Sequence, residues 1–292
     1  MTKQMNNFQA AVNEVPWRAL MSGVSVGTSA RAGMTGSRLD LWFASLDALP
    51  LADLTAVVAL DDIEMQRASR FLRPHDAARY VKAHTVLRLL LAAYVRVPAA
   101  DIHLMHGAHG KPRLTACNCA GAMAFNMSHG GSELLVGITR GGEMGVDIEV
   151  SGQDLDVSSL ARSCFSPDEV DYVLSGDTAQ ALNQRFLQVW TLKEAVIKAQ
   201  GGGLANSLSS FSVVCRGETA GSTRLLSDPR TWQLFMLPRD RGVHAALATD
   251  FHPDIRIHCL VNDVSGSNLR PAAAMPTAGW QAEPGGWAAD GA

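Results

Sequence analysis

The sequence is poor in cysteine, with five in 292 residues, an odd number without the spacing of a disulfide framework. Cys117 and Cys119 are one residue apart, whereas zinc-binding pairs usually have two residues between them, and no second pair accompanies them. The pattern excludes a disulfide scaffold and a zinc module. We therefore expect free thiols of the kind found in cytosolic proteins.

Long apolar runs are also missing. No run approaches the roughly 20 residues that a transmembrane helix needs, and the N-terminus lacks the basic-then-apolar design of a signal peptide. A net charge of −3 gives no reason to expect nucleic acid or an anionic membrane surface as the main partner. With 47% hydrophobic residues, the chain can form one or two domains with sizeable cores. We expect a soluble, cytoplasmic protein.

Two common catalytic patterns are absent as well. Ser128 and His129 are adjacent, but geometry rather than adjacency defines a nucleophile and its base, and no Gly-x-Ser-x-Gly turn is present. No Gly-x₄-Gly-Lys-Ser/Thr loop occurs, and Gly201–Gly203 follow a predicted helix, which is the wrong end for cradling a phosphate. These absences exclude a serine hydrolase and a generic nucleotide kinase.

The segment Trp190–Lys198 predicts an amphipathic helix, because apolar residues recur through it without Pro or Gly and Gly201–Gly203 end it. Glu194 and Lys198 are four residues apart, so their side chains project from one face. An isolated pair of this kind is usually an exposed ion pair that contributes a few tenths of a kcal/mol. Whether this pair has a function therefore depends on the other motifs in the sequence.

The segment Gly145–Glu149 predicts a short strand that alternates apolar and acidic residues. Asp147 and Glu149 would lie on one face, within reach of a single Mg²⁺ ion, which takes carboxylates, waters and phosphate oxygens as ligands. The alternative is the solvated side of an edge strand. If Glu194 supplied a third carboxylate, Lys198 would face a phosphate held by the metal.

These two segments, preceded by Gly110–Pro112 and Phe125–His129, resemble in order and spacing the motifs of the 4′-phosphopantetheinyl transferase superfamily, Sfp-type branch. The similarity covers roughly residues 39–260. It implies an α/β (α+β) fold of two similar lobes that form a pseudo-dimer. It also implies transfer of the 4′-phosphopantetheine arm from coenzyme A to a serine of an acyl, peptidyl or aryl carrier protein, with Mg²⁺ and release of 3′,5′-ADP.

The resemblance divides the chain into four parts. We expect a mobile extension over 1–37, an N-terminal lobe over 38–142, a C-terminal lobe with the metal and catalytic residues over 143–261, and a disordered tail over 262–292. Two lobes in one chain make a monomer the default. Local patterns predict helices at 51–69, 77–95, 155–164 and 180–200, and strands at 39–46, 102–105, 122–127, 133–139, 208–215, 232–237, 243–248 and 255–260.

The resemblance also assigns roles to individual residues. It implies that Arg67 holds the 3′-phosphate of coenzyme A, with Arg70, Arg79 and Arg88 as weaker candidates. Glu194 is the candidate base and Lys198 stabilises the phosphates, so these two are the expected catalytic residues. The metal ligands are Asp147, Glu149 and Glu194, and the coenzyme A contacts are Arg67, His109, Lys111, Ser128, His129, Asp147, Glu194 and Lys198.

Four points remain open at this stage. The family often has a lysine where this chain has Gly202, which removes one positive charge near the site. Glu169 fits a capping box with Ser166, and the resemblance adds that the segment 165–169 lies near the carrier-protein face and that Glu169 lines the site. A coenzyme A- or carrier-binding module without catalysis is the alternative, but all three carboxylates and Lys198 are present. The identity of the carrier is not encoded in any pattern here.

Overall fold

The structure is a computed structural model in which only part of the chain is described. His109, Gly202, Cys117 and Cys119 lie outside the described residues, as does the tail beyond residue 262. The described residues are 12–20, 37–57, 60–107, 110–115, 123–152, 155–201, 208–215, 217–219, 221–225, 228–240 and 242–262.

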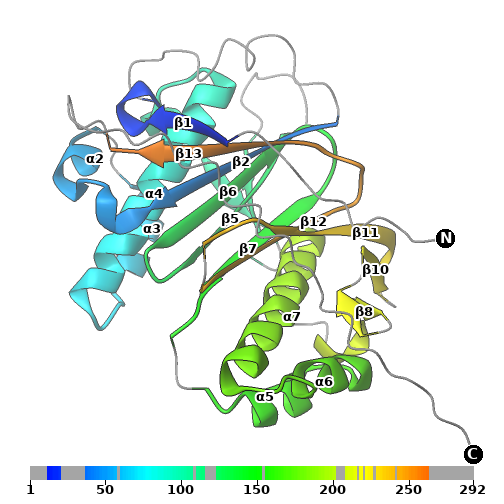
Figure 1. Cartoon of the computed structure of the whole chain (residues 1–292). Helices are drawn as coiled ribbons and strands as arrows, with labels where there is room; N and C mark the ends of the chain where they lie inside the picture. Colours follow the sequence, from blue (N-terminus) through cyan, green and yellow to red (C-terminus); the bar gives the residue numbers. More distant parts are fainter. Residues whose placement is uncertain are drawn as a thin grey trace, which may run out of the picture. The chain divides into compact units, whose positions relative to one another are not determined.

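Two sheets form the centre of the fold (Figure 1). The first has the strand order β1-β13-β2-β6-β5, with β13 parallel to β1 and β2 and the other pairs antiparallel. The second has the order β10-β11-β12-β7 and is antiparallel throughout. The strands are β1 (Val12–Pro16), β2 (Arg38–Ser45), β5 (Ala124–Gly130), β6 (Glu133–Thr139), β7 (Met144–Val150), β10 (Ser222–Leu225), β11 (Asp228–Leu237), β12 (Val243–Thr249) and β13 (Asp254–Val261).

Helices and two short ribbons of paired strands complete the described elements. β3 (Leu104–His106) pairs with β4 (Pro112–Leu114), and β8 (Val214–Cys215) pairs with β9 (Glu218–Thr219). The α-helices are α2 (Leu51–Val57), α3 (Asp62–Ala68), α4 (Pro74–Val95), α5 (Val157–Cys164), α6 (Pro167–Leu174) and α7 (Ala179–Gln200); the 3₁₀ helices are η1 (Trp17–Leu20), η2 (Leu46–Ala48), η3 (Ala99–Asp101) and η5 (Leu208–Ser210).

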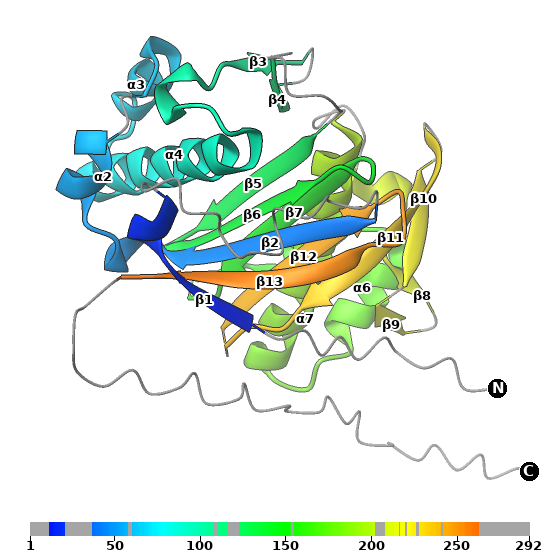
Figure 2. The same ribbon diagram turned by 90° about the horizontal axis from the view of Figure 1, so that it is seen from above.

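Alternation along the strands produces four layers, helix on sheet on sheet on helix. In the first sheet Trp42 packs with Leu90 of α4, while Phe43, its neighbour, points to the other face. That other face packs against Val146 of the second sheet. The far face of the second sheet, which includes Ala246, packs against α5, α6 and α7. The two sheets and their helices lie in this order in Figures 1 and 2, which confirms the predicted α/β (α+β) class.

The structure corrects the N-terminal boundary. Residues 12–20 lie in the segment expected to be a mobile extension, but β1 pairs with β13 in register from Val12 opposite Ile257. Trp17 is fully buried, and its indole N–H donates to Asn262 Oδ1 at 3.3 Å. The partner strand comes from the other end of the described chain, so no local period in the sequence reveals the pairing.

The structure also moves β13 out of the predicted C-terminal lobe. The strand was expected to close the lobe over 143–261, but it pairs along its length with β2, from Asp254 opposite Arg38 to Leu260 opposite Ala44. Ile257 packs in the core between the two sheets, and Leu260 packs on the opposite side, against the α4 layer. The C-terminal half therefore contributes one strand, β13, to the sheet that also holds β2, β5 and β6.

Two helix boundaries differ from the sequence-based prediction. The single helix expected over 51–69 is two helices, because Asp61 begins α3 with a capping box to Glu64. α4 begins at Pro74 with Arg73 as its N-cap, whereas the helix was expected to begin at residue 77. Proline is favoured in the first turn because it needs no intrahelical hydrogen-bond partner there.

A buried network joins α3 to α4. Glu64 accepts from Arg88 Nε at 2.8 Å, and His84 Nδ1 lies 2.8 Å from its other oxygen. Arg88 also donates to Asp61 and to the carbonyl of Ile102, both at 2.7 Å. Burial opposes ionisation, but the hydrogen bonds from His84 and Arg88 dominate and lower the pKa of Glu64 to about 2. Arg88, considered above as a weaker phosphate-contact candidate, is thus a buried structural residue.

The network predicts a stability change in acid. Since the pKa of Glu64 is about 2 in the fold and near 4.5 when unfolded, its contribution is complete above pH 4.5 and is lost as the pH falls toward 2. The loss amounts to about 3 kcal/mol in the free energy of unfolding. Urea titrations of wild type and Glu64→Gln at several pH values would measure it: the stability difference between them should shrink as the pH falls. A difference that stays constant with pH would contradict the assignment.

Close packing of β7 on α7 predicts that a larger residue at Gly145 destabilises the protein. A Cβ at Gly145 would lie 2.2 Å from the carbonyl oxygen of Ala195 and 2.3 Å from the amide nitrogen of Ala199. Both are backbone atoms, so Gly145→Ala must separate the strand from the helix, and we expect a loss of about 1–3 kcal/mol in urea unfolding. Gly221→Ala is the matched control, since no atom lies within 4 Å of its added carbon. Equal stabilities of the two variants would refute the packing argument.

Candidate active site

The candidate site lies where the two sheets meet, between β5 and β7. Asn126 on β5 accepts a hydrogen bond from the backbone N–H of Val146 on β7 at 2.9 Å. A Cβ at Gly130 would lie 2.6 Å from the carbonyl oxygen of Ile148, so the two backbones approach too closely for any larger residue there. This approach brings side chains of β5 against the acidic face of β7.

Asp147, Ser128 and Lys198 form one hydrogen-bonded cluster. Asp147 Oδ1 accepts from the Ser128 hydroxyl at 2.8 Å and from Lys198 Nζ at 2.5 Å. Lys198 also donates to the Ser128 oxygen at 2.8 Å. The three side chains come from β7, β5 and α7, so the cluster depends on the packing of all three elements. Ser128, which was expected to contact coenzyme A, lies beside the acidic residues.

Glu149 and Glu194 surround this cluster with further negative charge. Burial raises the pKa of Glu149, as do the charges of Asp147 and Glu194, while Lys198 and Trp190 lower it. Burial also raises the pKa of Glu194, and Asp147 adds to this while Lys198 opposes it. Lys198 is hydrogen-bonded to Asp147, and its charge also acts on Glu149 and Glu194; the repulsion that remains among the three carboxylates favours an additional cation.

The predicted metal triad is not preformed. Within the described ranges, no group of three or more His, Cys, Asp or Glu side chains is arranged so that it could hold a metal ion. Asp147 Oδ2 is nevertheless buried, and no hydrogen-bond partner for it occurs in that part of the chain. An unpartnered carboxylate oxygen between two carboxyls with raised pKa values has the chemistry of a hard-cation ligand. Ligation of a metal by Asp147, Glu149 and Glu194 therefore stays a prediction. The chemistry of these three donors fits it.

Positive groups gather beside the carboxylates. Burial lowers the pKa of His129, and the nearby charges of His84, Lys198 and Arg79 lower it further, while the charge of Asp76 opposes them. A histidine surrounded in this way lies in a region of positive potential, which suits a bound phosphate. Arg79 is itself paired with Asp47, at 2.6 and 3.0 Å. Arg70 is exposed in the turn after α3.

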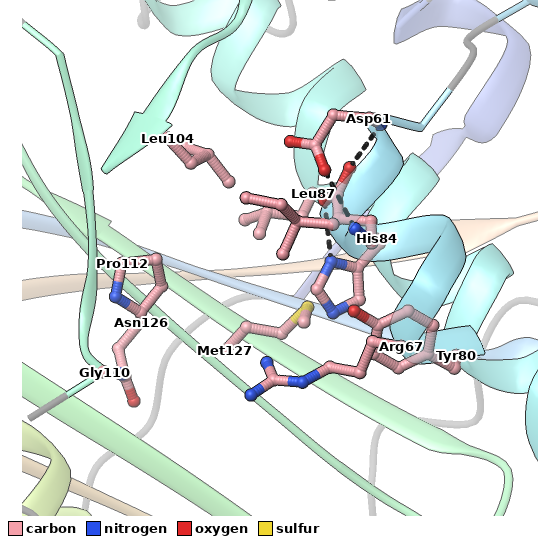
Figure 3. A pocket seen from close by; sticks show the side chains of 12 residues that line it. Asp61, Arg67, Tyr80, His84, Leu87, Leu104, Gly110, Pro112, Asn126 and Met127 are labelled. Carbon is pink, nitrogen blue, oxygen red and sulfur yellow. Dashed lines mark hydrogen bonds and ion pairs between the residues drawn. The ribbon is translucent and has the colours of Figure 1, made fainter. Parts of the chain in front are cut away.

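A pocket opens next to this positive region, between α3, α4, β5 and the β3–β4 turn. Figure 3 shows Arg67, Tyr80 and His84 on one side of it and Gly110 and Pro112 on the other. The Tyr80 ring stacks on His84, with centroids 4.1 Å apart. Arg67 is exposed, and its charge lowers the pKa of the Tyr80 hydroxyl, which burial raises. The predicted phosphate residue Arg67 therefore does border a pocket.

Lys111 is placed differently from the prediction. Its ammonium donates to Glu143 Oε2 at 2.7 Å and to the carbonyls of Ala199 and Met144 at 2.9 and 3.2 Å. An ammonium has three N–H donors, and these contacts use all of them. The contacts do not support direct binding of coenzyme A by Lys111.

Glu169 and Lys193 form a buried pair that the sequence patterns did not indicate. Both side chains are 0% exposed and their charged atoms lie 2.8 Å apart. Lys193 also donates to the carbonyls of Leu208 and Phe211, and Glu169 accepts from the N–H of Val213. This position in the core corrects the expectation that Glu169 lines the site. The capping box accounts for only one bond of Glu169, the one from the Ser166 N–H. Its other partners, Lys193 and Val213, are distant in sequence, so a local pattern does not reveal them.

Two family models match separate parts of the chain, one in each predicted lobe. The 4′-phosphopantetheinyl transferase superfamily model matches residues 143–248, and the model of a 4′-phosphopantetheinyl transferase N-terminal region matches residues 51–138. In the part of the chain that the structure describes, no helix has the length and apolar character needed to cross a membrane.

Individual relatives agree with the family models. HetI of Nostoc sp., named as a 4′-phosphopantetheinyl transferase, is 29% identical over 217 residues, 74% of this chain and 89% of its own. A putative 4′-phosphopantetheinyl transferase of Synechocystis sp. is 34% identical over 51% of this chain and 60% of its own, and Sfp of Bacillus subtilis is 28% identical over 51% and 63%. The aligned region thus spans less than two thirds of the latter two.

The two family models cover both halves of the fold, and their joint match confirms the resemblance seen in the four motifs. The chain belongs to the 4′-phosphopantetheinyl transferase superfamily, in its Sfp-type branch.

Proposed function

We propose that this protein transfers the 4′-phosphopantetheine arm of coenzyme A to a serine hydroxyl of an acyl, peptidyl or aryl carrier protein. The observation that carries the proposal is the cluster of Asp147, Ser128 and Lys198 at the junction of the sheets. It joins a surplus of carboxylates to a region of positive charge, which suits a ligand rich in phosphate. Relatives named for this activity support the same reaction.

Asp147, Glu149 and Glu194 would hold Mg²⁺ in this proposal. The unpartnered oxygen of Asp147 and the raised pKa values of the two glutamates support that role. The bound ion supplies neutralisation of the negative charge on the pyrophosphate oxygens. The described residues contribute the rest of the chemistry through binding, orientation and proton transfer.

The positive groups hold coenzyme A by its phosphates. Arg67 at the pocket rim binds the 3′-phosphate, and His129 lies close enough to His84 and Lys198 to share the field that attracts it. Lys198 turns from Asp147 toward the pyrophosphate oxygens, where a point charge stabilises the negative charge of the transition state. Binding at two separate phosphate groups orients the phosphorus that is attacked.

Transfer then moves one phosphoryl-linked arm between two oxygens. The acceptor serine oxygen bonds to the phosphorus that carries the pantetheine arm, and the bond from that phosphorus to the bridging oxygen breaks. The bridging oxygen leaves with the electron pair as part of 3′,5′-ADP. Glu194 accepts the serine proton as the general base.

Intact-mass spectrometry of an apo carrier protein tests the proposal. With coenzyme A and Mg²⁺, the carrier should gain the mass of the phosphopantetheine arm. Glu194→Gln keeps the shape but not the base, so we expect transfer to slow by roughly 10²–10⁴-fold. Asp171→Asn, an exposed position on α6, is the matched control and should match wild type.

Each outcome of this experiment has a definite meaning. Full activity of Glu194→Gln would remove the proposed role of Glu194. Coenzyme A binding without any gain in mass, across several unrelated carriers, would favour a binding module instead of an enzyme. Loss of both binding and transfer in the wild type would contradict the whole assignment.

Lys198 provides an independent test. Lys198→Met removes the ammonium that faces Asp147 and Ser128, and we expect kcat/KM for coenzyme A to fall by roughly 10²–10³-fold. Lys198→Arg keeps the charge with a different shape and should retain part of the activity. Steady-state rates with one carrier protein would measure both. Equal losses in the two variants would show that shape, not charge, is what the site requires.

A further inference from the structure

Lys111 links three parts of the fold through one ammonium. It lies in the turn between β3 and β4, and its side chain is only 9% exposed. Its acceptors are Glu143 just before β7, the carbonyl of Met144 at the start of β7, and the carbonyl of Ala199 in the last turn of α7. A lysine that bonds the final carbonyls of a helix stabilises that end of it.

The elements that Lys111 joins are the ones that carry the candidate site. Met144 precedes Asp147 by three residues on β7, and Ala199 directly follows Lys198 on α7. The hydrogen bond between Asp147 and Lys198 therefore spans the same two elements that the Lys111 ammonium holds together. A small separation of the end of α7 from β7 would change this contact first.

The same side chain also touches the end of α7 by packing. Gly201 ends the helix with a φ of 74°, and a Cβ there would lie 3.2 Å from Lys111 Cδ. On the other side, the neighbours of Lys111 in sequence, Gly110 and Pro112, line the pocket that Arg67 borders (Figure 3). Lys111 thus connects the pocket wall to the carboxylate and lysine cluster.

We propose that Lys111 is a positioning residue that holds the last turn of α7 against β7, and so fixes Lys198 relative to Asp147, instead of a ligand of coenzyme A. The inference rests on the proposed function for its catalytic consequence. The structural part of the inference, that Lys111 fixes the last turn of α7, does not depend on that function. Glu143 belongs to the same arrangement, since its carboxylate accepts from the Lys111 ammonium, and its hydrogen bonds among the described residues go to Lys111, Arg113 and Asp250.

Three variants separate this role from its alternatives. Lys111→Met removes all three hydrogen bonds, and Glu143→Gln weakens one of them without removing the lysine. Arg113→Met is the matched control, because exposed Arg113 also pairs with Glu143, through Oε1 at 2.7 Å, but has no hydrogen bond to α7 or β7 among the described residues. Coenzyme A affinity by calorimetry, kcat with one carrier protein, and hydrogen exchange along α7 are measured for each.

The proposal expects a specific set of results. In Lys111→Met, kcat should fall by roughly 10–100-fold, the scale of a misplaced catalytic group, while the dissociation constant of coenzyme A stays within about twofold. Amides at 195–201 should exchange faster, while those at 183–190 do not change. Glu143→Gln should give a smaller loss that is not additive with Lys111→Met. Arg113→Met should behave as wild type.

Other results would overturn it. A large loss of coenzyme A affinity with kcat unchanged would make Lys111 a ligand of the substrate. Reduced stability with unchanged kcat, affinity and exchange would make it a structural lysine only. If the wild type transfers nothing, the proposed function fails, and hydrogen exchange alone decides: unchanged exchange at 195–201 in both Lys111→Met and Glu143→Gln would reject the positioning role as well.

Discussion

A buried carboxylate on the strand between the two sheets constrains the rest of the molecule. β7 presents Val146 and Ile148 to the core shared by the sheets, and Asp147 to α7 on its other face. A charge in that position needs partners, and they come from two other elements, Ser128 on β5 and Lys198 on α7. The close contacts at Gly130 and Gly145 follow from this need, because they bring those elements near enough.

Sequence patterns predict those parts of the site that belong to one element at a time. Asp147 and Glu149 share a face because a strand alternates, and Glu194 and Lys198 share a face because they are one helical turn apart. The contact of Ser128 with Asp147 and the enclosure of Lys111 depend on elements distant in sequence. No local pattern encodes them, and family resemblance assigned both residues to coenzyme A.

In the fold, too, local sequence patterns predict single elements but not how distant elements pair. The largely apolar strands β2, β6 and β12 lie within one residue of where the sequence predicts them, because a short apolar run that is buried on both faces is typical of a core strand. The division of residues 51–69 depended on one cap, Asp61 with Glu64, which a helical pattern alone does not reveal. The place of β13 in the first sheet could not be predicted, because the apolar pattern of a strand does not specify which strand it pairs with.

The pairing of β1 with β13 affects more than the position of the first residues. β13 has β2 on one side, and β1 covers its other side. A shortened chain lacking residues 12–20 would uncover a row of unpaired backbone groups beside Ile257 and expose the surface on which Trp17 packs. Such an edge is a template for strands of other molecules. The N-terminal segment therefore protects solubility, and its removal would favour aggregation while leaving the catalytic side chains in place.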